Sequence, residues 1–155
     1  MGSRGLTGGL EAAGLRVAVI AARYNQEICD QLLEGALSSL RSHGATEEAI
    51  LVVRVPGAVE LPLAALHAAR SGRFDAVICL GCVIKGETAH FEYVAGEASA
   101  GVMRVALDTG VPCAFGVLTT YDHEQAVARS GPVDNKGAEA AETAIEMANL
   151  IKRLA

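Results

Sequence analysis

The amino-acid sequence predicts an α/β fold, a three-layer sandwich in which helices cover both faces of a four-stranded parallel sheet. Two observations predict this class. Short runs rich in Val, Ile and Cys alternate along the chain with longer segments whose apolar residues recur at helical spacing. Such alternation gives parallel strands joined by right-handed crossovers. The length of 155 residues matches one ordinary domain, so we expect a flavodoxin-like arrangement around a single sheet.

The first half of the chain contains two strand–helix units. The first strand is expected over residues 16–22, which are rich in Val and Ile, and the first helix over 26–43, where apolar residues repeat every three or four positions until a glycine. The second strand, 49–55, ends at a Pro-Gly pair, and the second helix, 60–71, is followed by a glycine. Glycine and proline at these places are typical of element ends.

The second half continues the alternation. A third strand is expected over 75–81 and a third helix over 91–109, again closed by a glycine. The remaining elements are a fourth strand over 112–119, a short helix over 123–130, a break at 131–135 and a last helix over 136–154.

The surfaces predict self-association. The third helix carries a face of small residues, the last helix has apolar residues around much of its circumference, and only 20% of the chain is charged. An isolated domain of this size must cover its surface with polar groups, so these helices are expected to pack against other subunits. Residues 1–15 contain five glycines and are expected to form an N-terminal arm, ordered only where a partner holds it. Residues 16–155 are the single domain.

Charge and hydropathy argue against two classes of partner. The formal net charge is −5 and the lysines and arginines do not cluster, whereas a nucleic-acid-binding protein needs a basic face. The longest uncharged apolar runs, at 17–22 and 76–80, are far shorter than the ~20 residues that span a bilayer. The first residues lack the apolar core of a secretion signal. We therefore expect no nucleic acid, no membrane and a cytoplasmic protein.

Four cysteines, Cys29, Cys79, Cys82 and Cys113, lie mostly in predicted strands or on a helix face, where Cys commonly acts as a small buried hydrophobe. Cys79 and Cys82 match C-x-x-C, but a redox pair normally lies at a helix N-terminus, and Cys79 lies inside a strand. No second pair with ligand spacing accompanies them, so we expect neither a disulfide framework nor a metal site.

The most informative segment for function is residues 81–91, Gly-Cys-Val-Ile-Lys-Gly-Glu-Thr-Ala-His-Phe, which follows a strand and leads into a helix. In open α/β sheets, ligands lie beyond the carboxyl ends of the strands, and the free N–H groups of the next helix favour a phosphate. Thr88 adds a hydroxyl, and His90 can donate and accept protons near neutrality. The segment therefore predicts a site for a small phosphorylated substrate.

Other candidate side chains lie near the ends of the remaining strands. Tyr24 and Phe115 are two of only six aromatic residues, and an aromatic ring at the rim can stack on a planar heterocycle or simply cap the core. Glu60 can cap its helix or accept hydrogen bonds from ligand hydroxyls. Arg129 and Lys136 flank the break between the last two helices and could reach a phosphate.

Several of these segments together resemble the 6,7-dimethyl-8-ribityllumazine synthase family. The likeness covers roughly residues 8–154, and its motifs agree in order and spacing: Arg23-Tyr24-Asn25, 55–62, 80–91, 112–119, Glu124-Gln125-Ala126, Arg129-Ser130-Gly131 and Asn135-Lys136-Gly137. It implies the penultimate step of riboflavin synthesis, in which 5-amino-6-(D-ribitylamino)uracil condenses with 3,4-dihydroxy-2-butanone 4-phosphate and phosphate and water are lost. It implies no cofactor and no metal.

The resemblance also implies roles for individual residues. Tyr24 stands where the family stacks an aromatic ring on the pyrimidine, and His90 is similar to its proton-transfer residue. Contacts to the pyrimidine ring and ribityl chain are implied for Ala58, Val59, Glu60, Cys82, Val83 and Ile84, the last three through backbone groups. Phosphate contacts are implied for Glu87, Thr88, Arg129 and Lys136. Phe115 and Arg129 match residues that a neighbouring subunit contributes, which implies an active site between subunits.

The chain departs from the family between Arg129 and Gly137, where it is one residue shorter and lacks the first of two lysines. Lys136 matches the second. Members of the family form pentamers, decamers or icosahedral cages of sixty subunits, and this connection helps to choose among them. Two other functions stay open at this point: an archaeal-type riboflavin synthase, which resembles the family, and a non-catalytic flavin- or pterin-binding assembly.

Overall fold

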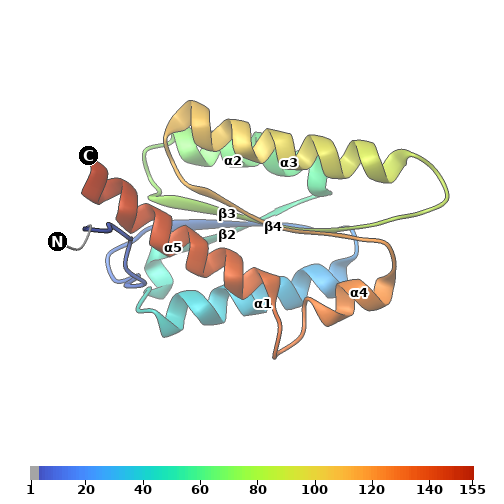
Figure 1. Cartoon of the computed structure of the whole chain (residues 1–155), viewed down its shortest axis with the longest axis horizontal. Coiled ribbons are helices and arrows are strands. Elements are labelled where there is room, and N and C mark those ends of the chain that lie inside the picture. Colours follow the sequence, from blue (N-terminus) through green and yellow to red (C-terminus); the bar gives the residue numbers. More distant parts are fainter. Residues whose placement is uncertain (1–3) are drawn as a thin grey trace.

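The computed structural model describes residues 4–155, and its four strands form one parallel sheet in the order β2-β1-β3-β4 (Figure 1). The strands are β1 (Val17–Ala22), β2 (Ile50–Val55), β3 (Ala76–Ile84) and β4 (Cys113–Thr120). The helices are α1 (Gln26–Ser42), α2 (Leu61–Arg70), α3 (His90–Thr109), α4 (His123–Ala128) and α5 (Lys136–Leu154), with short 3₁₀ turns η1 (Glu47–Ala49) and η2 (Ala58–Glu60). Within the described residues, no helix is long and apolar enough to cross a membrane.

The elements form three layers. Helices α2 and α3 cover one face of the sheet, and α1, α4 and α5 cover the other (Figure 1). The predicted α/β sandwich with a four-stranded, flavodoxin-like parallel sheet is therefore confirmed. Because all strand pairs are parallel, the carboxyl ends of the strands lie at one edge of the sheet. The turns that follow β1, β2 and β3 meet at this edge.

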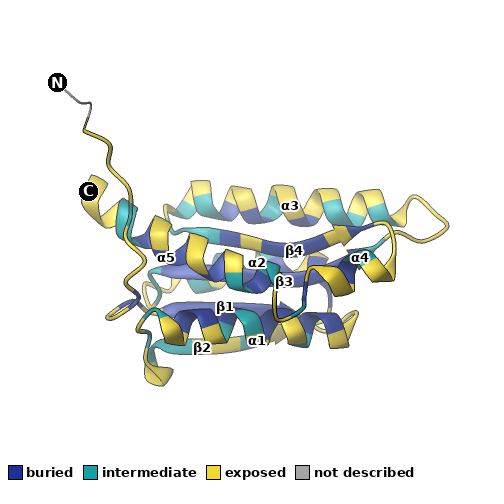
Figure 2. Cartoon of the chain, turned by 60° about the horizontal axis from the view of Figure 1, so that its bottom comes forward, coloured by how far each residue is buried: buried dark blue, intermediate teal, exposed yellow. Residues whose placement is uncertain are grey.

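The two central strands carry the core. All six residues of β1 and the first eight of β3 are buried, and Figure 2 shows both strands in dark blue between the helical layers. Ile20, Ile78 and Leu80 are fully buried, and each such side chain contributes about 1.5–3 kcal/mol of stability. Strands buried on both faces need continuous apolar runs, which explains why these segments contain no charged residue.

Helix α5 lies close against α1. A Cβ atom on Gly137 would collide with the carbonyl group of Leu32, so the absence of a side chain permits this approach. The Asn135 side chain caps α5 by accepting a hydrogen bond from the Ala138 N–H at 3.0 Å, and its amide donates to the carbonyl oxygen of Gln31 at 3.1 Å. The Asn-Lys-Gly motif therefore fixes where α5 begins and how it meets α1.

Element boundaries differ from the sequence prediction in several places. The third strand was expected over 75–81, but β3 continues to Ile84, because its last residues pair with β4 as far as Thr120. The second helix begins at Leu61, after the unpredicted turn η2, and a second unpredicted turn, η1, precedes β2. Helix α4 ends at Ala128, two residues before the predicted end, since the chain then turns into a bridge between Ser130 and Asn135.

The segment expected to be an arm contacts its own domain. Ala12 and Leu15 are buried, so the core begins before residue 16. Farther towards the N-terminus, the Asn149 amide of α5 donates to the carbonyl oxygens of Gly9 and Glu11 at 2.7 and 3.0 Å. Residues 1–3 of the expected arm lie outside the described part of the chain.

Candidate active site

Five of the predicted site residues meet at the carboxyl edge of the sheet. They line one cavity of about 390 Å³ together with two residues to which the sequence assigned no role: Tyr24, Ala58, Val59, Glu60 and His90, with Gly57 and Val94. The turns after β1 and β2 and the start of α3 form its walls. An aromatic ring, a carboxylate and an imidazole thus surround one space, which suits a planar ligand that carries polar groups.

The turn after β1 holds Tyr24 beside the end of β2. The backbone N–H groups of Arg23 and Tyr24 donate to the carbonyl oxygens of Val55 and Pro56 at 2.9 and 3.0 Å. The carbonyl oxygen of Tyr24 accepts a hydrogen bond from Cys29 Sγ at 3.2 Å. The backbone of Tyr24 is therefore fixed on both sides, while its side chain stays 71% exposed and available for stacking.

Glu60 caps the turn in which it lies. Its Oε2 accepts a hydrogen bond from the Gly57 N–H at 3.1 Å, while the Glu60 N–H donates to the carbonyl oxygen of Gly57 at 3.2 Å, so two bonds close the turn η2. The sequence left open whether Glu60 caps its helix or binds ligand hydroxyls; the residue stands at the N-cap of α2, but its side chain makes no capping bond to that helix. A carboxylate has about four acceptor positions, so the capping bond leaves the carboxylate able to accept further hydrogen bonds in the cavity. Because the cap fixes the carboxylate, any ligand contact it makes is pre-oriented.

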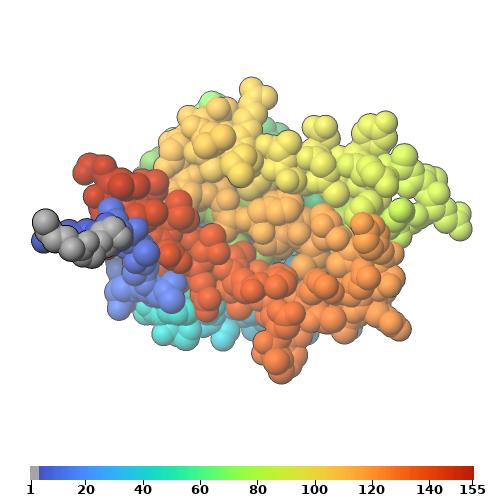
Figure 3. All heavy atoms as spheres, viewed as in Figure 1, coloured from blue at the N-terminus to red at the C-terminus, as the bar shows by residue number. Residues whose placement is uncertain are grey.

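The turn after β3 is short, polar and exposed. It covers residues 85–89 between β3 and α3, and Thr88 Oγ1 accepts a hydrogen bond from the N–H of His90, the first residue of α3, at 3.4 Å. Figure 3 shows the segment around residue 90, in yellow-green, projecting at one end of the molecule above the orange segment of residues 120–130. The first-turn N–H groups of a long helix attract anions, and the phosphate site expected at this segment stays a prediction.

A cation and two aromatic rings connect this turn to the end of β4. The Lys85 N–H donates to the carbonyl oxygen of Thr120 at 2.9 Å. The Lys85 ammonium lies 5.6 Å from the centroid of the Tyr121 ring, and that ring lies 6.3 Å from the ring of Phe91. Cation–π contacts of this kind stabilise exposed sites by about 0.5–1 kcal/mol, so this contact favours the observed conformation of the turn by a small amount.

Cys82, Val83 and Ile84 belong to β3 rather than to the turn. Cys82 and Val83 are buried, so only their backbone groups could contact a ligand, and the contacts that the resemblance implies for them stay a prediction. Burial raises the pKa of the Cys82 thiol to about 11, and this thiol is therefore neutral at pH 7. The carbonyl oxygen of Cys82 accepts a hydrogen bond from Asn25 Nδ2 at 2.9 Å.

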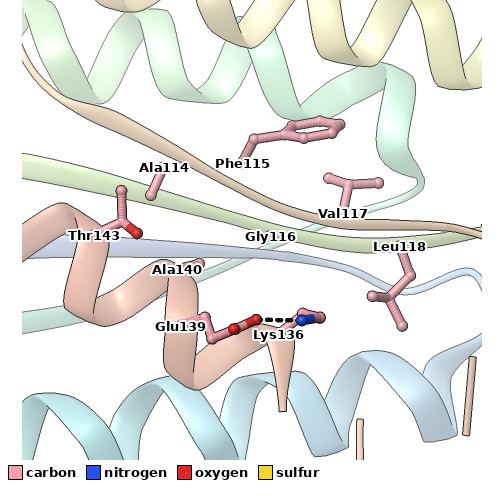
Figure 4. A pocket seen from close by; sticks show the side chains of 9 residues that line it. All are labelled: Ala114, Phe115, Gly116, Val117, Leu118, Lys136, Glu139, Ala140 and Thr143. Carbon is pink, nitrogen blue, oxygen red and sulfur yellow. Dashed lines mark ion pairs between the residues drawn. The ribbon is translucent and has the colours of Figure 1, made fainter. Parts of the chain in front are cut away.

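The other predicted residues lie outside this cavity. Phe115 and Lys136 line a separate cavity of about 230 Å³ at the exposed edge of β4, with Glu139 and Thr143 (Figure 4). In that view, Phe115 points to the α2–α3 side of the sheet, whereas Lys136 lies on the α5 side. Arg129 is exposed and donates to the carbonyl oxygen of Gln125 at 3.0 Å. One chain thus holds two separate groups of candidate residues.

Lys136 forms ion pairs with two carboxylates. Its Nζ lies 2.7 Å from Glu139 and 3.6 Å from Asp134. The hydrogen bond with Glu139 raises the pKa of Lys136 above its ordinary value, so the side chain is cationic at neutral pH. A phosphate at Lys136 must therefore compete with these carboxylates.

Sequence reasoning missed three contributions to the site. Val94 lies one helical turn after His90, and that spacing could have placed both on the same wall. Gly57 and Asn25 stand inside quoted motifs, but their contacts with Tyr24 and Cys82 depend on tertiary structure. Within residues 4–155, no group of three or more His, Cys, Asp or Glu residues is placed to hold a metal ion.

Comparison with known proteins identifies the family. A family model described as 6,7-dimethyl-8-ribityllumazine synthase matches residues 14–152, which includes both groups of candidate residues. Members of this family are transferases, and the match supports lumazine synthase activity in general. Since the match covers nearly the whole of the 155-residue sequence, the chain is an enzyme that belongs to the 6,7-dimethyl-8-ribityllumazine synthase family.

Proposed function

We propose that the protein condenses 5-amino-6-(D-ribitylamino)uracil with 3,4-dihydroxy-2-butanone 4-phosphate to give 6,7-dimethyl-8-ribityllumazine, phosphate and water. One observation carries the proposal: in a chain of the lumazine synthase family, Tyr24, Glu60 and His90 line a single cavity. The reaction requires a stacking surface, an acceptor for hydroxyl groups and a proton carrier, and these three side chains supply them.

The pyrimidine occupies the cavity beside Tyr24. The phenol ring stacks on the heterocycle, and the heterocycle extends beyond the residues that line the cavity to reach the backbone of Cys82, Val83 and Ile84 at the end of β3, the second wall of the ring slot. Glu60 accepts hydrogen bonds from the ribityl hydroxyls, with Ala58 and Val59 beside the same chain. The support for this arrangement is that Glu60 is already fixed by its bond to the Gly57 N–H.

The phosphate of the second substrate binds at the start of α3. Thr88 donates its hydroxyl, and the N–H groups that follow Gly86 point to the same anion. Glu87 contributes through its backbone, because an ionised carboxylate would repel a phosphate. Arg129 and Lys136 supply the positive charge, and Arg129 comes from a neighbouring subunit.

His90 moves protons during the condensation. The primary amine of the pyrimidine attacks the ketone carbon, and loss of water gives an imine. Removal of a proton from the adjacent carbon then accompanies departure of phosphate and leaves an enol. The terminal carbon of this enol takes up a proton while the hydroxyl loses one, which gives a methyl ketone, and attack of the second nitrogen on this ketone closes the ring with loss of water. Each step needs a proton taken up or released near the same carbon atoms, which one imidazole can do. Much of the acceleration comes from holding the two substrates in contact.

The active unit is a pentamer or a multiple of it, with each site between two subunits. Phe115 and Arg129 of one subunit complete the cavity formed by Tyr24, Glu60 and His90 of the next. Two observations support this: Phe115 and Arg129 lie outside the cavity of their own chain, and α3 exposes Tyr93, Met103 and Leu107 with 71%, 61% and 77% of their surface accessible. Apolar residues exposed along one helix support an interface where they form a continuous patch.

The test is a turnover assay of the purified full chain with both substrates, followed by chromatographic identification of the product and measurement of released phosphate. Formation of the lumazine and phosphate in equal amounts is the expected result. Incubation with the lumazine alone is the control: riboflavin formation there would assign the protein as a riboflavin synthase. Binding of the pyrimidine or of flavin without turnover would make it a binding assembly and overturn the proposal.

A further inference from the structure

Asn25, which precedes α1, has a left-handed backbone conformation. Its φ is 58° and its ψ is 51°, and within residues 4–155 it is the only residue other than glycine with a positive φ. The left-handed region is unfavourable for residues with a Cβ atom. Such a conformation persists where surrounding contacts hold it, and it is common at functional sites.

The Asn25 side chain does not cap the helix that it precedes. Asn25 is the N-cap of α1, where asparagine normally accepts a hydrogen bond from the helix, yet no such bond is present. Instead, its Nδ2 donates to the carbonyl oxygen of Cys82 at 2.9 Å. Both the backbone and the side chain of Asn25 therefore serve a contact with β3.

This contact is made where β1 no longer pairs with β3. The ladder between β1 and β3 ends at the pair Ala21–Leu80, whereas β3 continues to Ile84 beside β4. Beyond Leu80, β3 thus has a strand neighbour only on the β4 side within the described sheet. The Asn25 amide supplies a donor to Cys82 on the side where β1 has already turned towards α1.

The same residue follows Tyr24 directly. The Tyr24 backbone is bonded to Pro56 and to Cys29, and Asn25 links the next position to Cys82. Tyr24 and the segment 82–84 are the two walls of the ring slot in the proposed function. We infer that Asn25 is a positioning residue that sets the distance between these walls and thereby the affinity for the pyrimidine. This inference rests on the proposed function.

Three substitutions separate the backbone role from the hydrogen bond. Asn25→Gly accepts a positive φ without strain but lacks the amide. Asn25→Asp keeps a side chain that tolerates this conformation, but it directs a carboxylate oxygen at a carbonyl oxygen. Asn25→Ala loses both features. The matched control is Asn149→Ala, which removes an amide that also donates to backbone carbonyls but belongs to α5.

The experiment measures KM for each substrate, kcat, thermal unfolding, and the rate at which a thiol reagent labels Cys82 relative to Cys79. For Asn25→Gly we expect an unfolding midpoint near that of the parent, faster labelling of Cys82, and a KM for the ribitylaminouracil raised several-fold to about tenfold, the effect of one hydrogen bond. The KM for the butanone phosphate should be unchanged. Asn25→Asp should raise the pyrimidine KM further, and Asn149→Ala should leave both KM values unchanged.

A parent-like pyrimidine KM in Asn25→Gly would overturn the inference while the proposed function stands. Equal loss of affinity for both substrates, with a lowered unfolding midpoint, would show a purely structural role and would also overturn it. A parent protein that forms no lumazine would instead refute the proposed function, and the ring-slot role with it.

Discussion

Tyr24 and Gly57 lie against each other in the lining of the cavity. A Cβ atom added to Gly57 would lie 2.7 Å from Cδ2 of Tyr24 and 3.3 Å from Oε2 of Glu60. The φ of Gly57 is −147°, a conformation open to any residue, so glycine is needed here for space and not for backbone freedom. The position of the Tyr24 ring therefore depends on the absence of a side chain at residue 57.

Gly57→Ala should displace the Tyr24 ring and weaken pyrimidine binding. Overpacking of this kind costs about 1–3 kcal/mol, so we expect the KM for the ribitylaminouracil to rise about tenfold or more, with a smaller effect on the butanone phosphate. Steady-state kinetics with each substrate varied in turn measures this. Gly9→Ala is the control, because a Cβ atom there meets nothing within 4 Å. An unchanged pyrimidine KM would show that the ring can move aside without consequence.

His90→Ala should slow the condensation without unfolding the protein. General acid–base groups contribute about 10²–10⁴-fold, and we expect the low end, because proximity supplies part of the rate. His90 is exposed, so the unfolding midpoint and the affinity for the pyrimidine should stay near those of the parent. His123→Ala, which removes an exposed histidine from α4, is the matched control. Parent-like kcat at neutral pH would exclude His90 from proton transfer.

Arg129→Ala should weaken binding of the butanone phosphate. A hydrogen bond to a charged group contributes about 1.5–3 kcal/mol, so its KM should rise about 10–100-fold while that of the ribitylaminouracil stays nearly constant. Inorganic phosphate should inhibit the parent competitively and the variant much less. Arg41→Ala, which removes an exposed arginine paired with Glu47, controls for loss of charge. Equal weakening of both substrates would instead make Arg129 an interface residue.

The fold could be predicted from the sequence because the residue patterns of its central strands are easy to recognise. β1 and β3 are continuous apolar runs, and the helices between strands end at or near glycines such as Gly110, which caps α3 in the left-handed conformation. The end of β3 could not be predicted in this way. Residues 81–84 contain a glycine and precede a polar turn, and only their pairing with β4 across more than thirty residues of chain shows that they are strand.

Candidate site residues could be predicted where an aromatic or ionisable residue comes shortly after a strand in the sequence, as Tyr24, Glu60 and His90 do. What could not be predicted are contacts between turns. The Glu60 side chain bonds to the Gly57 N–H in the turn before α2 and not to the helix that it was expected to cap, and the link from Asn25 to Cys82 joins residues 57 positions apart. The ion pair between Lys136 and Glu139 could have been predicted from their spacing, because residues three apart on a helix are neighbours.

The buried thiols should make stability fall in alkaline solution. Burial raises the pKa of Cys29 from its ordinary value of 9.0 to about 12 and raises that of Cys79 as well. Above pH 9 the unfolded chain loses these protons while the folded protein keeps them, so the unfolded state binds fewer protons. Stability is therefore complete below pH 9 and declines as the pH rises towards the folded values, by up to about 1.4 kcal/mol per pH unit for each thiol.

The check is urea unfolding of the parent and of Cys79→Ala between pH 8 and pH 11. The variant should be less stable at pH 8, because a buried sulfur is lost, but its free energy of unfolding should decline less steeply above pH 9. The difference in slope isolates this thiol from the lysines and tyrosines that titrate in the same range. Parallel curves for the two proteins would mean that the Cys79 thiolate is accommodated in the folded state.

Activity should depend on residues from two subunits. If Tyr24, Glu60 and His90 come from one chain and Phe115 and Arg129 from its neighbour, a mixed assembly of His90→Ala and Arg129→Ala subunits contains interfaces with both intact halves. In a ring with heterologous contacts, about a quarter of the interfaces in an equal mixture have this composition. Co-refolded subunits, assayed with the butanone phosphate below its parent KM, should therefore exceed the summed activity of the two variants refolded separately.

The matched control for this mixture is His90→Ala with Glu60→Ala. Both residues line the same cavity of one chain, so every subunit of that mixture has a damaged cavity although its Phe115 and Arg129 are intact, and co-refolding should restore nothing. Sedimentation of each mixture verifies that the assemblies have the same size, which removes differences in association as a cause. Recovery in the first mixture and not in the second follows only if the cavity and Arg129 are contributed by different subunits. Equal behaviour of both mixtures would mean that His90 and Arg129 act from the same chain, and the proposal of a shared site would have to be abandoned.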